Sequence, residues 1–472
     1  MPTNRRPPSV DRLISAVPAA ASAGRDREAI VAAARAVIEA ERQRLAASLQ
    51  AEARELADLA SDVLATIGGR EAAWGSGAVG AINATGVLIH TNLGRASWPA
   101  AAIDAAVAAA GAPLLLELDA ASGRRGRRYR AAEDALVALT GAEEALVTNN
   151  NAAAVALAVG LAGRGGGVVV SRGELVEIGG GVRIPEIVRR AGGRLIEVGT
   201  TNRTRAADFE APLAERRARL VLRVHRSNFR QEGFVEDADL AAVAELAHRV
   251  GATVVDDLGS GALLDTARFG LPHEPQPAER LAAGADLVTF SGDKLVGGPQ
   301  AGLVVGRADL IAKLRRDPLA RVMRPDKVTL AAVAATLGLY RSGRAAVEIP
   351  LWRSVAMPLA EVQARATRVA AAVDGTALPT EATFGGGALP GVVVPSFGVA
   401  LGARDGKPDA LAAALRSGSP PVIGRIEHDR VILDLRTVEP ERDDALVAAV
   451  LAARERAAAL AARARSGAGT RG

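Results

Sequence analysis

The stretch "SGDKLVGGPQAG" places one lysine, Lys294, between a serine–glycine turn and a glycine–proline turn. Lysine is rare in this chain, since Lys294, Lys313, Lys327 and Lys407 are the only four among its 58 basic residues. A lysine amine can lose its proton and form a Schiff base with an aldehyde, which an arginine guanidinium cannot do. A lysine kept in such a glycine-rich segment is therefore a candidate nucleophile.

Two aspartates end an apolar run about 40 residues before this lysine, in the segment "VVDDLGSG" at 254–261. A carboxylate at a strand end can pair with a protonated ring nitrogen and keep an aromatic cofactor electron-poor. We choose Asp256 for this role and Asp257 as the second choice. Taken alone, the two aspartates fit an ordinary turn at a strand end about as well as they fit this role.

A third polar segment, "VTNNNAAAV" at 147–155, joins an apolar run to a stretch of helix-forming residues. Asn149, Asn150 and Asn151 can offer amide and side-chain donors to a phosphate at the helix N-terminus. Taken alone, they are equally typical of helix caps. A lysine, a carboxylate and a phosphate-binding turn in this chain order are together what a fold-type I enzyme dependent on pyridoxal phosphate (PLP) requires.

The elements that must position these residues alternate between short apolar runs and amphipathic stretches. A helix is expected at 238–250. This alternation predicts an α/β fold with a largely parallel sheet. The expected strands are 166–171, 193–199, 219–225, 251–257, 285–291 and 302–306.

Three domains are expected along the chain. Apolar residues recur at helical spacing from Asp26 to Ile67, which predicts a small helical domain over residues 1–75. The large α/β domain follows over residues 76–340. Gly- and Pro-rich turns, strand pairs and a final alanine-rich helix predict a smaller α+β domain over residues 341–472.

Several motifs resemble one family. The chain is similar to bacterial selenocysteine synthase, L-seryl-tRNA(Sec) selenium transferase, from about residue 10 to 450. The chain differs from the family pattern at Arg226, where members usually have a small residue. The segments that carry the resemblance are "INATGVLIHTNLGRA" (82–96), "SRGELVEIGGGVRIPEI" (171–187), "VHRSNFRQEGF" (224–234), "DDLGSGALLD" (256–265), "ADLVTFSGDKLVGGPQAGLVVG" (285–306), "GGGALP" (385–390) and "PVIGRI" (421–426).

The resemblance implies a transferase of selenocysteine biosynthesis, with PLP as cofactor, seryl-tRNA(Sec) as substrate and selenophosphate as selenium donor. The reaction would pass through a PLP-bound aminoacrylyl intermediate still esterified to tRNA. The family also implies a homo-oligomer, commonly a decamer built as a pentamer of dimers. Its N-terminal domain would bind the tRNA.

The resemblance assigns roles to individual residues. Lys294 would anchor PLP and, once released, remove the α-proton of the substrate. Its neighbour Asp293 and Arg95 of "HTNLGRA" are further catalytic candidates, and His225 is counted among the cofactor-binding residues.

Two more arginines, Arg321 and Arg324 of "LARVMRPDK", would share one face of a helical turn. With Arg95 they are the candidate site for the selenophosphate anion, which bidentate arginine forks suit. The alternative reading is a solvated basic surface, because the chain is rich in arginine.

Two other functions stay open. The chain could be a PLP-dependent lyase acting on a free amino acid or amino sugar, although such relatives tend to lack the N-terminal domain. It could also be a non-catalytic RNA-binding protein on the same fold, which the intact lysine segment disfavours. The segment "GRRGRRYR" at 123–130 is equally consistent with a solvated loop and with contact to phosphate groups.

The composition argues against disulfide-bonded, metal-binding, membrane-spanning and secreted proteins. The chain has no cysteine, and its five histidines show no ligand spacing, so we expect neither a disulfide nor a metal site. We see no apolar run near the roughly 20 residues that span a bilayer. No apolar segment follows the N-terminal arginines, so we expect no signal peptide and a cytoplasmic location.

Overall fold

The computed structural model describes residues 6–18, 27–47, 53–64, 66, 80–126, 130–215, 218–402 and 407–468 of the 472-residue chain. Internal contacts group the chain into two compact units. The first consists of Met1–Ile82, Ala403–Val422 and Ala448–Gly472, and the second of Asn83–Gly402 and Ile423–Val447. The second unit holds the large sheet and also the strands expected in the C-terminal part.

A seven-stranded sheet forms the centre of the second unit, with strand order β2-β10-β9-β8-β7-β3-β6. Strands β6, β3, β7, β8 and β9 pair in parallel, and β10 runs antiparallel to both of its neighbours. The predicted α/β class with a largely parallel sheet is confirmed. The strands are β2 (Glu144–Thr148), β3 (Gly167–Ser171), β6 (Arg194–Val198), β7 (Ala218–Val224), β8 (Thr253–Gly259), β9 (Leu287–Ser291) and β10 (Gly302–Gly306).

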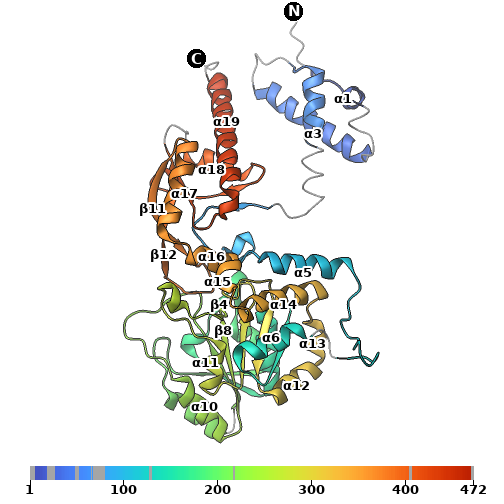
Figure 1. Cartoon of the computed structure of the whole chain (residues 1–472). Coiled ribbons are helices and arrows are strands. Elements are labelled where there is room, and N and C mark those ends of the chain that lie inside the picture. Colours follow the sequence, from blue (N-terminus) through green and yellow to red (C-terminus); the bar gives the residue numbers. More distant parts are fainter. Residues whose placement is uncertain are drawn as a thin grey trace, which may run out of the picture. The chain divides into compact units, whose positions relative to one another are not determined.

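Helices cover the sheet, and two separate apolar clusters mark its two faces (Figure 1). Val221 and Val254 belong to the cluster that includes α6 (Ala131–Thr140), α10 (Leu240–Arg249), α14 (Lys327–Arg341) and α16 (Pro350–Ala356). Leu222 and Val255 belong to the other cluster, which includes α7 (Asn151–Val159), α8 (Ile184–Arg190) and α12 (Ala308–Arg316). Consecutive residues of one strand thus face opposite layers of helices.

A four-stranded antiparallel sheet, β11-β12-β15-β14, also lies in the second unit. Its strands are β11 (Thr376–Thr383), β12 (Val393–Leu401), β14 (Arg425–Glu427) and β15 (Arg430–Asp434). The shorter strands are β1 (Ile82–Asn83), β4 (Glu177–Ile178), β5 (Val182–Arg183) and β13 (Val422–Ile423), and the other helices of this part are α5 (Ala100–Gly111), α9 (Glu210–Ala214), α11 (Pro277–Ala282), α13 (Pro318–Val322), α15 (Ala345–Glu348) and α17 (Leu359–Ala372).

The N-terminal helices of the first unit have an apolar core of their own. Leu13, Ile38 and Leu59 are at most 1% exposed and belong to a cluster formed only by residues 10–64. The N-terminal helices are α1 (Val10–Ala16), α3 (Arg27–Ala47) and 56–64. Towards the C-terminus, the first unit includes α18 (Pro408–Arg416) and the part of α19 (Asp443–Ala468) that begins at Ala448. Across the described ranges, we find no helix with the length and apolar character needed to cross a bilayer.

Candidate active site

A cavity of about 240 Å³ lies at the carboxyl edge of the seven-stranded sheet. Strands β2, β7, β8 and β9 run in the same direction and end at this edge. Ligands of open α/β sheets bind outside the carboxyl ends of the strands. The lining residues include Arg95, Asn150, Asn151, His225, Ser227, Asp257, Gly259, Ser291, Lys294 and Gln300.

Lys294 follows the end of β9 by three residues and is only 7% exposed. The backbone of its loop is closed on itself, since Gly292 N donates to Ala301 O and Gly298 N donates to Gly292 O, each at 2.9 Å. Burial lowers the pKa of the Lys294 amine below its ordinary value, while the nearby Asp257 carboxylate acts in the opposite direction. A lower pKa favours the unprotonated amine, which is the form that acts as a nucleophile or accepts a proton.

Gly387, in the segment "GGGALP", lies directly against the Lys294 side chain. Its φ is +98°, and a Cβ atom added to it would stand 2.6 Å from Lys294 Nζ and 2.7 Å from Cε. The left-handed backbone favours glycine here, and an added Cβ would displace the end of the Lys294 side chain. The segment "GGGALP" thus packs directly against the lysine, although the two are distant in the sequence.

Replacing Gly387 with alanine should push the Lys294 amine out of place. We expect the rate of Schiff-base formation with added PLP to fall on the order of 10²-fold, because an ångström of misplacement can cost that much. Visible absorption of the bound cofactor measures the rate. Gly386→Ala is the matched control, because its added Cβ would meet only Thr91 Oγ1 at 3.6 Å. Equal rates in the two variants would contradict this role for Gly387.

Asp257 is the carboxylate that faces Lys294 in this cavity. One of its oxygens, Oδ1, accepts from Asn151 Nδ2 at 2.8 Å, from Thr289 Oγ1 at 3.1 Å and from Gly259 N at 3.1 Å. Burial raises the pKa of the Asp257 carboxyl above its ordinary value, and the bond from Asn151 acts against this rise. The three donors hold the carboxylate in one orientation, ready to pair with a cation in the cavity.

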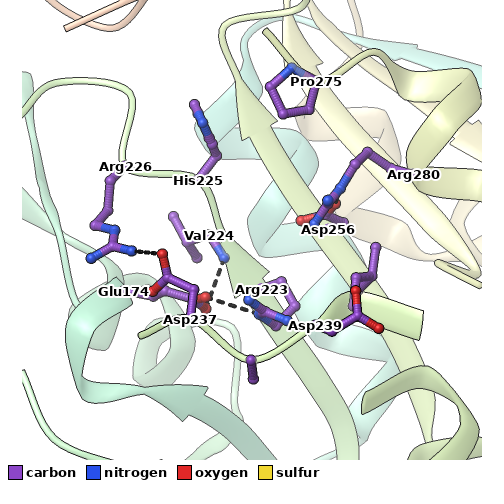
Figure 2. Close-up of a pocket in the computed structure, with 12 residues that line it drawn as sticks. Glu174, Arg223, Val224, His225, Arg226, Asp237, Asp239, Asp256, Pro275 and Arg280 are labelled. Carbon is purple, nitrogen blue, oxygen red and sulfur yellow. Dashed lines mark hydrogen bonds and ion pairs between the residues drawn. The ribbon is translucent and has the colours of Figure 1, made fainter. Parts of the chain in front are cut away.

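The sequence-based choice of Asp256 over Asp257 does not fit this geometry. Asp256 points to the opposite face of β8, where it is ion-paired with Arg280 of α11 (Figure 2). Asp256 pairs in register with Arg223 of β7, and Asp257 with Val224. Because side chains alternate along a strand, only one of two adjacent aspartates can face the cavity, and it is Asp257.

The three asparagines after β2 have separate tasks. Asn150 caps α7, since its side-chain oxygen accepts from Ala153 N at 2.9 Å, and Asn151 holds Asp257 as described. Both line the cavity, whereas Asn149 does not, and its backbone N donates to Met323 O at 2.8 Å. The first N–H groups of a helix have no intrahelical partner. The start of α7 can therefore receive a phosphate through Asn150 and Asn151, but Asn149 is not placed for it.

Arg95 and Asp293 form an ion pair beside Lys294, with Arg95 Nη1 at 2.7 Å from Asp293 Oδ2. Arg95 lines the cavity, and Asp293 is 5% exposed. The other oxygen of Asp293, Oδ1, is buried and has no hydrogen-bond partner among the described residues. Arg95 has a φ of 67°, which is uncommon for a residue other than glycine. The structure thus brings two of the predicted catalytic residues to the predicted lysine.

Arg321 and Arg324 do not reach this cavity within one chain. They line a separate cavity of about 400 Å³ together with Glu133, Arg315 and Leu330. Arg324 is ion-paired with Glu117 in the segment that follows α5. The prediction that these two arginines stand beside Lys294 is therefore not met inside a single chain.

Sequence reasoning missed a second polar cavity, of about 250 Å³, on the opposite face of β7 and β8 (Figure 2). Glu174 Oε1 accepts from Arg223 Nε at 2.9 Å, and Oε2 accepts from Val224 N at 3.1 Å. Both side chains are buried in a pair that holds the end of β7, next to His225. No local sequence pattern connects Glu174 with Arg223, because 49 residues separate them.

His225 borders both cavities, directly after β7. Its backbone N donates to Asp257 O at 2.8 Å. Of "GRRGRRYR", residues 127–129 lie outside the described part of the chain, and Arg130 bonds Asp134 and Glu144. Within the described ranges, no group of three histidine, aspartate or glutamate residues is arranged to hold a metal ion.

Comparison with solved structures supports the fold. The structure is similar to that of D-glucosaminate-6-phosphate ammonia-lyase, with a TM-score of 0.60 and 22% sequence identity over 82% of this chain and 99% of that one. This similarity concerns the fold alone, and the predicted fold-type I class is confirmed.

Comparison with protein families and with known relatives identifies the family as well as the fold. The model of the SelA family, L-seryl-tRNA selenium transferase, matches residues 81–439. The L-seryl-tRNA(Sec) selenium transferase of Hyphomonas neptunium is 43% identical over 92% of this chain and 95% of its own length. That of Solidesulfovibrio magneticus is 48% identical over 79% of this chain and 81% of its own. With the site geometry and these relatives in agreement, the chain belongs to the L-seryl-tRNA(Sec) selenium transferase family.

Proposed function

We propose that this protein converts L-seryl-tRNA(Sec) to L-selenocysteinyl-tRNA(Sec) with selenophosphate as selenium donor. One observation carries the proposal. In a chain of this family, a buried lysine faces a buried aspartate at the carboxyl edge of the sheet, next to the N-terminus of α7. Acting on an aminoacyl-tRNA, the enzyme would work in the cytoplasm.

The residues of the cavity fit pyridoxal phosphate. Lys294 offers a buried primary amine, Asp257 a carboxylate held by three donors, and the first turn of α7 a phosphate site at Asn150 and Asn151. The buried oxygen Oδ1 of Asn151 has no hydrogen-bond partner within the described ranges, which leaves it available to a bound group. When bound, the cofactor supplies an electron sink for the negative charge that develops at the substrate α-carbon.

The chain's own residues supply binding and proton transfer. The Lys294 amine, whose pKa burial lowers, can take the α-proton of the seryl group because it already lies in the cavity. Arg95 adds a positive charge that a selenophosphate anion can meet, and Asp293 holds this guanidinium at one angle. Lys294 is 7% exposed and lines the cavity, so its amine is directed to a group bound there.

The assay that tests the proposal offers purified enzyme, loaded with PLP, either seryl-tRNA(Sec) or free serine in the presence of selenophosphate. We expect selenocysteine to be found when the amino acid is hydrolysed from the product tRNA, and we expect no reaction with free serine. Elimination from free serine without selenium transfer to seryl-tRNA(Sec) would favour the lyase instead and overturn the proposal.

A homo-oligomer, such as a decamer built as a pentamer of dimers, is part of the proposal. Exposed apolar side chains occur on α13 and on the segment after α5, namely Leu319 (44%), Val322 (74%), Leu115 (60%) and Leu118 (50%). A second copy of the chain covering these residues would remove their apolar area from water. It could also bring Arg321 and Arg324 against the Lys294 cavity of its neighbour.

A subunit-mixing experiment tests this placement of the arginines. We expect Arg321→Ala and Arg324→Ala each to lower selenium transfer by roughly tenfold or more while PLP and tRNA binding stay near wild type, because a charge-assisted contact to the donor is lost. Mixing inactive Lys294→Ala chains with Arg324→Ala chains, after dissociation and reassembly, should restore part of the activity. Mixed assemblies that stay inactive, although light scattering shows that they formed, would contradict shared sites.

The N-terminal helical segment is proposed to bind the tRNA. Because its apolar core comes only from residues 10–64, deleting residues 1–70 should leave the sheet and PLP binding intact. We expect seryl-tRNA affinity, measured by filter binding, to fall by at least roughly tenfold, since phosphate contacts dominate such affinities. An unchanged affinity in the truncated protein would assign tRNA binding elsewhere.

A further inference from the structure

His225 directly follows β7 and lines both cavities. Figure 2 shows it among the residues that line the second cavity. Its backbone is fixed by the bond to Asp257 O, so its ring can move little except by side-chain rotation. The ring nitrogen Nδ1 is buried and has no hydrogen-bond partner among the residues that the structure describes. A buried polar atom without a partner is rare and calls for an explanation.

An acidic group close to this ring is Glu274, which is 3% exposed and whose buried oxygen Oε1 also has no hydrogen-bond partner in the described part of the chain. This oxygen lies 3.8 Å from His225 Nδ1. The backbone around Glu274 is held in place, because Glu274 N donates to Thr266 Oγ1 at 2.9 Å and Thr266 Oγ1 donates to Pro272 O at 2.6 Å. A buried carboxylate is costly unless it is paired, and His225 is the partner that the geometry offers.

We propose that Glu274 is a positioning residue that accepts the Nδ1–H of His225 and so directs the opposite nitrogen, Nε2, to the Lys294 cavity. A shift of less than about 1 Å would bring the two atoms to hydrogen-bond distance. The hydrogen bond made by one ring nitrogen decides which nitrogen carries the proton. In both charge states of the imidazole, Nδ1 then keeps its hydrogen, and Nε2 is the nitrogen that can accept or release a proton at the cavity.

The consequence for function rests on the proposed function, because it concerns what is bound next to Lys294. When the ring orientation is fixed, an unprotonated Nε2 can accept a hydrogen bond from a group bound in the cavity. Loss of Glu274 would therefore disturb the site without removing any group that contacts the substrate.

The test begins with the protonation of the ring, which needs neither cofactor nor substrate. The full chain is labelled with ¹⁵N-histidine and sedimented for magic-angle-spinning NMR, and the His225 signals are assigned by their loss in His225→Gln. We expect His225 to carry its hydrogen on Nδ1 in the wild-type chain and to lose this preference in Glu274→Leu. A wild-type His225 with its hydrogen on Nε2 alone would overturn the proposal, whether or not the protein transfers selenium.

Activity is then measured as a double-mutant cycle. We expect Glu274→Leu to lower selenium transfer by roughly 10- to 100-fold, as for groups that orient a functional histidine, and Glu274→Gln to lower it less because an acceptor remains. In a His225→Gln background, the Glu274 substitutions should have little further effect. Additive losses would show that Glu274 acts independently of His225 and would overturn the proposal.

Glu279 offers a matched control, because its carboxylate contacts another histidine, His273, at 3.0 Å on the surface. Glu279→Gln should change neither the His225 signals nor selenium transfer. If Glu274→Leu fails to fold, the NMR result on the wild-type chain and on Glu274→Gln still decides the matter. A Glu274→Gln variant with unchanged activity and an Nε2–H ring in place of Nδ1–H would count against the role of Glu274.

Discussion

Replacing Lys294 with alanine is expected to abolish selenium transfer, with a loss of at least about 10³-fold, while the fold is kept. The loss combines two tasks of one amine, which anchors the cofactor and takes the α-proton, and acid–base groups alone contribute 10²–10⁴-fold. The change enlarges an existing cavity beside Asp257 and Gly387, so we expect the packing of the sheet to stay as it is. Transfer of selenium to seryl-tRNA(Sec) and the visible absorption of bound PLP measure the effect.

Lys313→Ala is the matched control for Lys294. Lys313 lies on α12 with a side chain that is 60% exposed and 3.7 Å from Asp309, so its loss should change neither activity nor the absorption band. Borohydride reduction followed by peptide mapping should find PLP attached to Lys294. A cofactor attached to Lys313 or Lys327, or measurable selenium transfer by Lys294→Ala, would show that the lysine segment has been misread.

Asp257→Asn is expected to weaken PLP binding and to lower selenium transfer on the order of 10²-fold. The amide removes the negative charge that would face the cofactor, and the loss of one electrostatic partner in a dry site costs about this much. An amide can keep the shape of the carboxylate and an oxygen for Asn151, Thr289 and Gly259. PLP affinity from absorption titration and the rate at saturating PLP separate the two effects.

Asp256→Asn gives the contrast that decides between the two adjacent aspartates. It weakens the ion pair with Arg280 on the far face, so we expect lower thermal stability but PLP affinity and turnover within about threefold of wild type. The reverse result, with Asp256→Asn inactive and Asp257→Asn active, would restore the choice made from the sequence and refute the geometry described for β8.

Much of the architecture could be predicted from the sequence. Apolar runs that alternate with amphipathic stretches are a local signal, so the strands at 166–171, 219–225 and 251–257 were expected where they occur. The lysine was also predictable, because its segment is contiguous and its glycines are needed for the loop that encloses it. Order along the chain was enough to predict that the lysine, an aspartate pair and the asparagines meet at one edge, since parallel strands end together.

The tertiary structure alone decided which aspartate faces the cavity. Strand β8 is buried on both faces, so "VVDD" has no alternation of polar and apolar residues to indicate which side chain points where. The register of β7 and β8, and the two helix layers on either side, place Asp257 towards Lys294 and Asp256 towards Arg280.

Contacts between distant segments also could not be predicted from the sequence. Gly387 against Lys294, Glu174 with Arg223, and Glu274 beside His225 join residues from separate elements, and no spacing rule relates them. Arg321 and Arg324 show the converse, because a shared helical turn predicted their common direction but not the cavity they line. Local patterns determine elements, whereas the packing of those elements determines which side chains meet, and a catalytic site depends on the second.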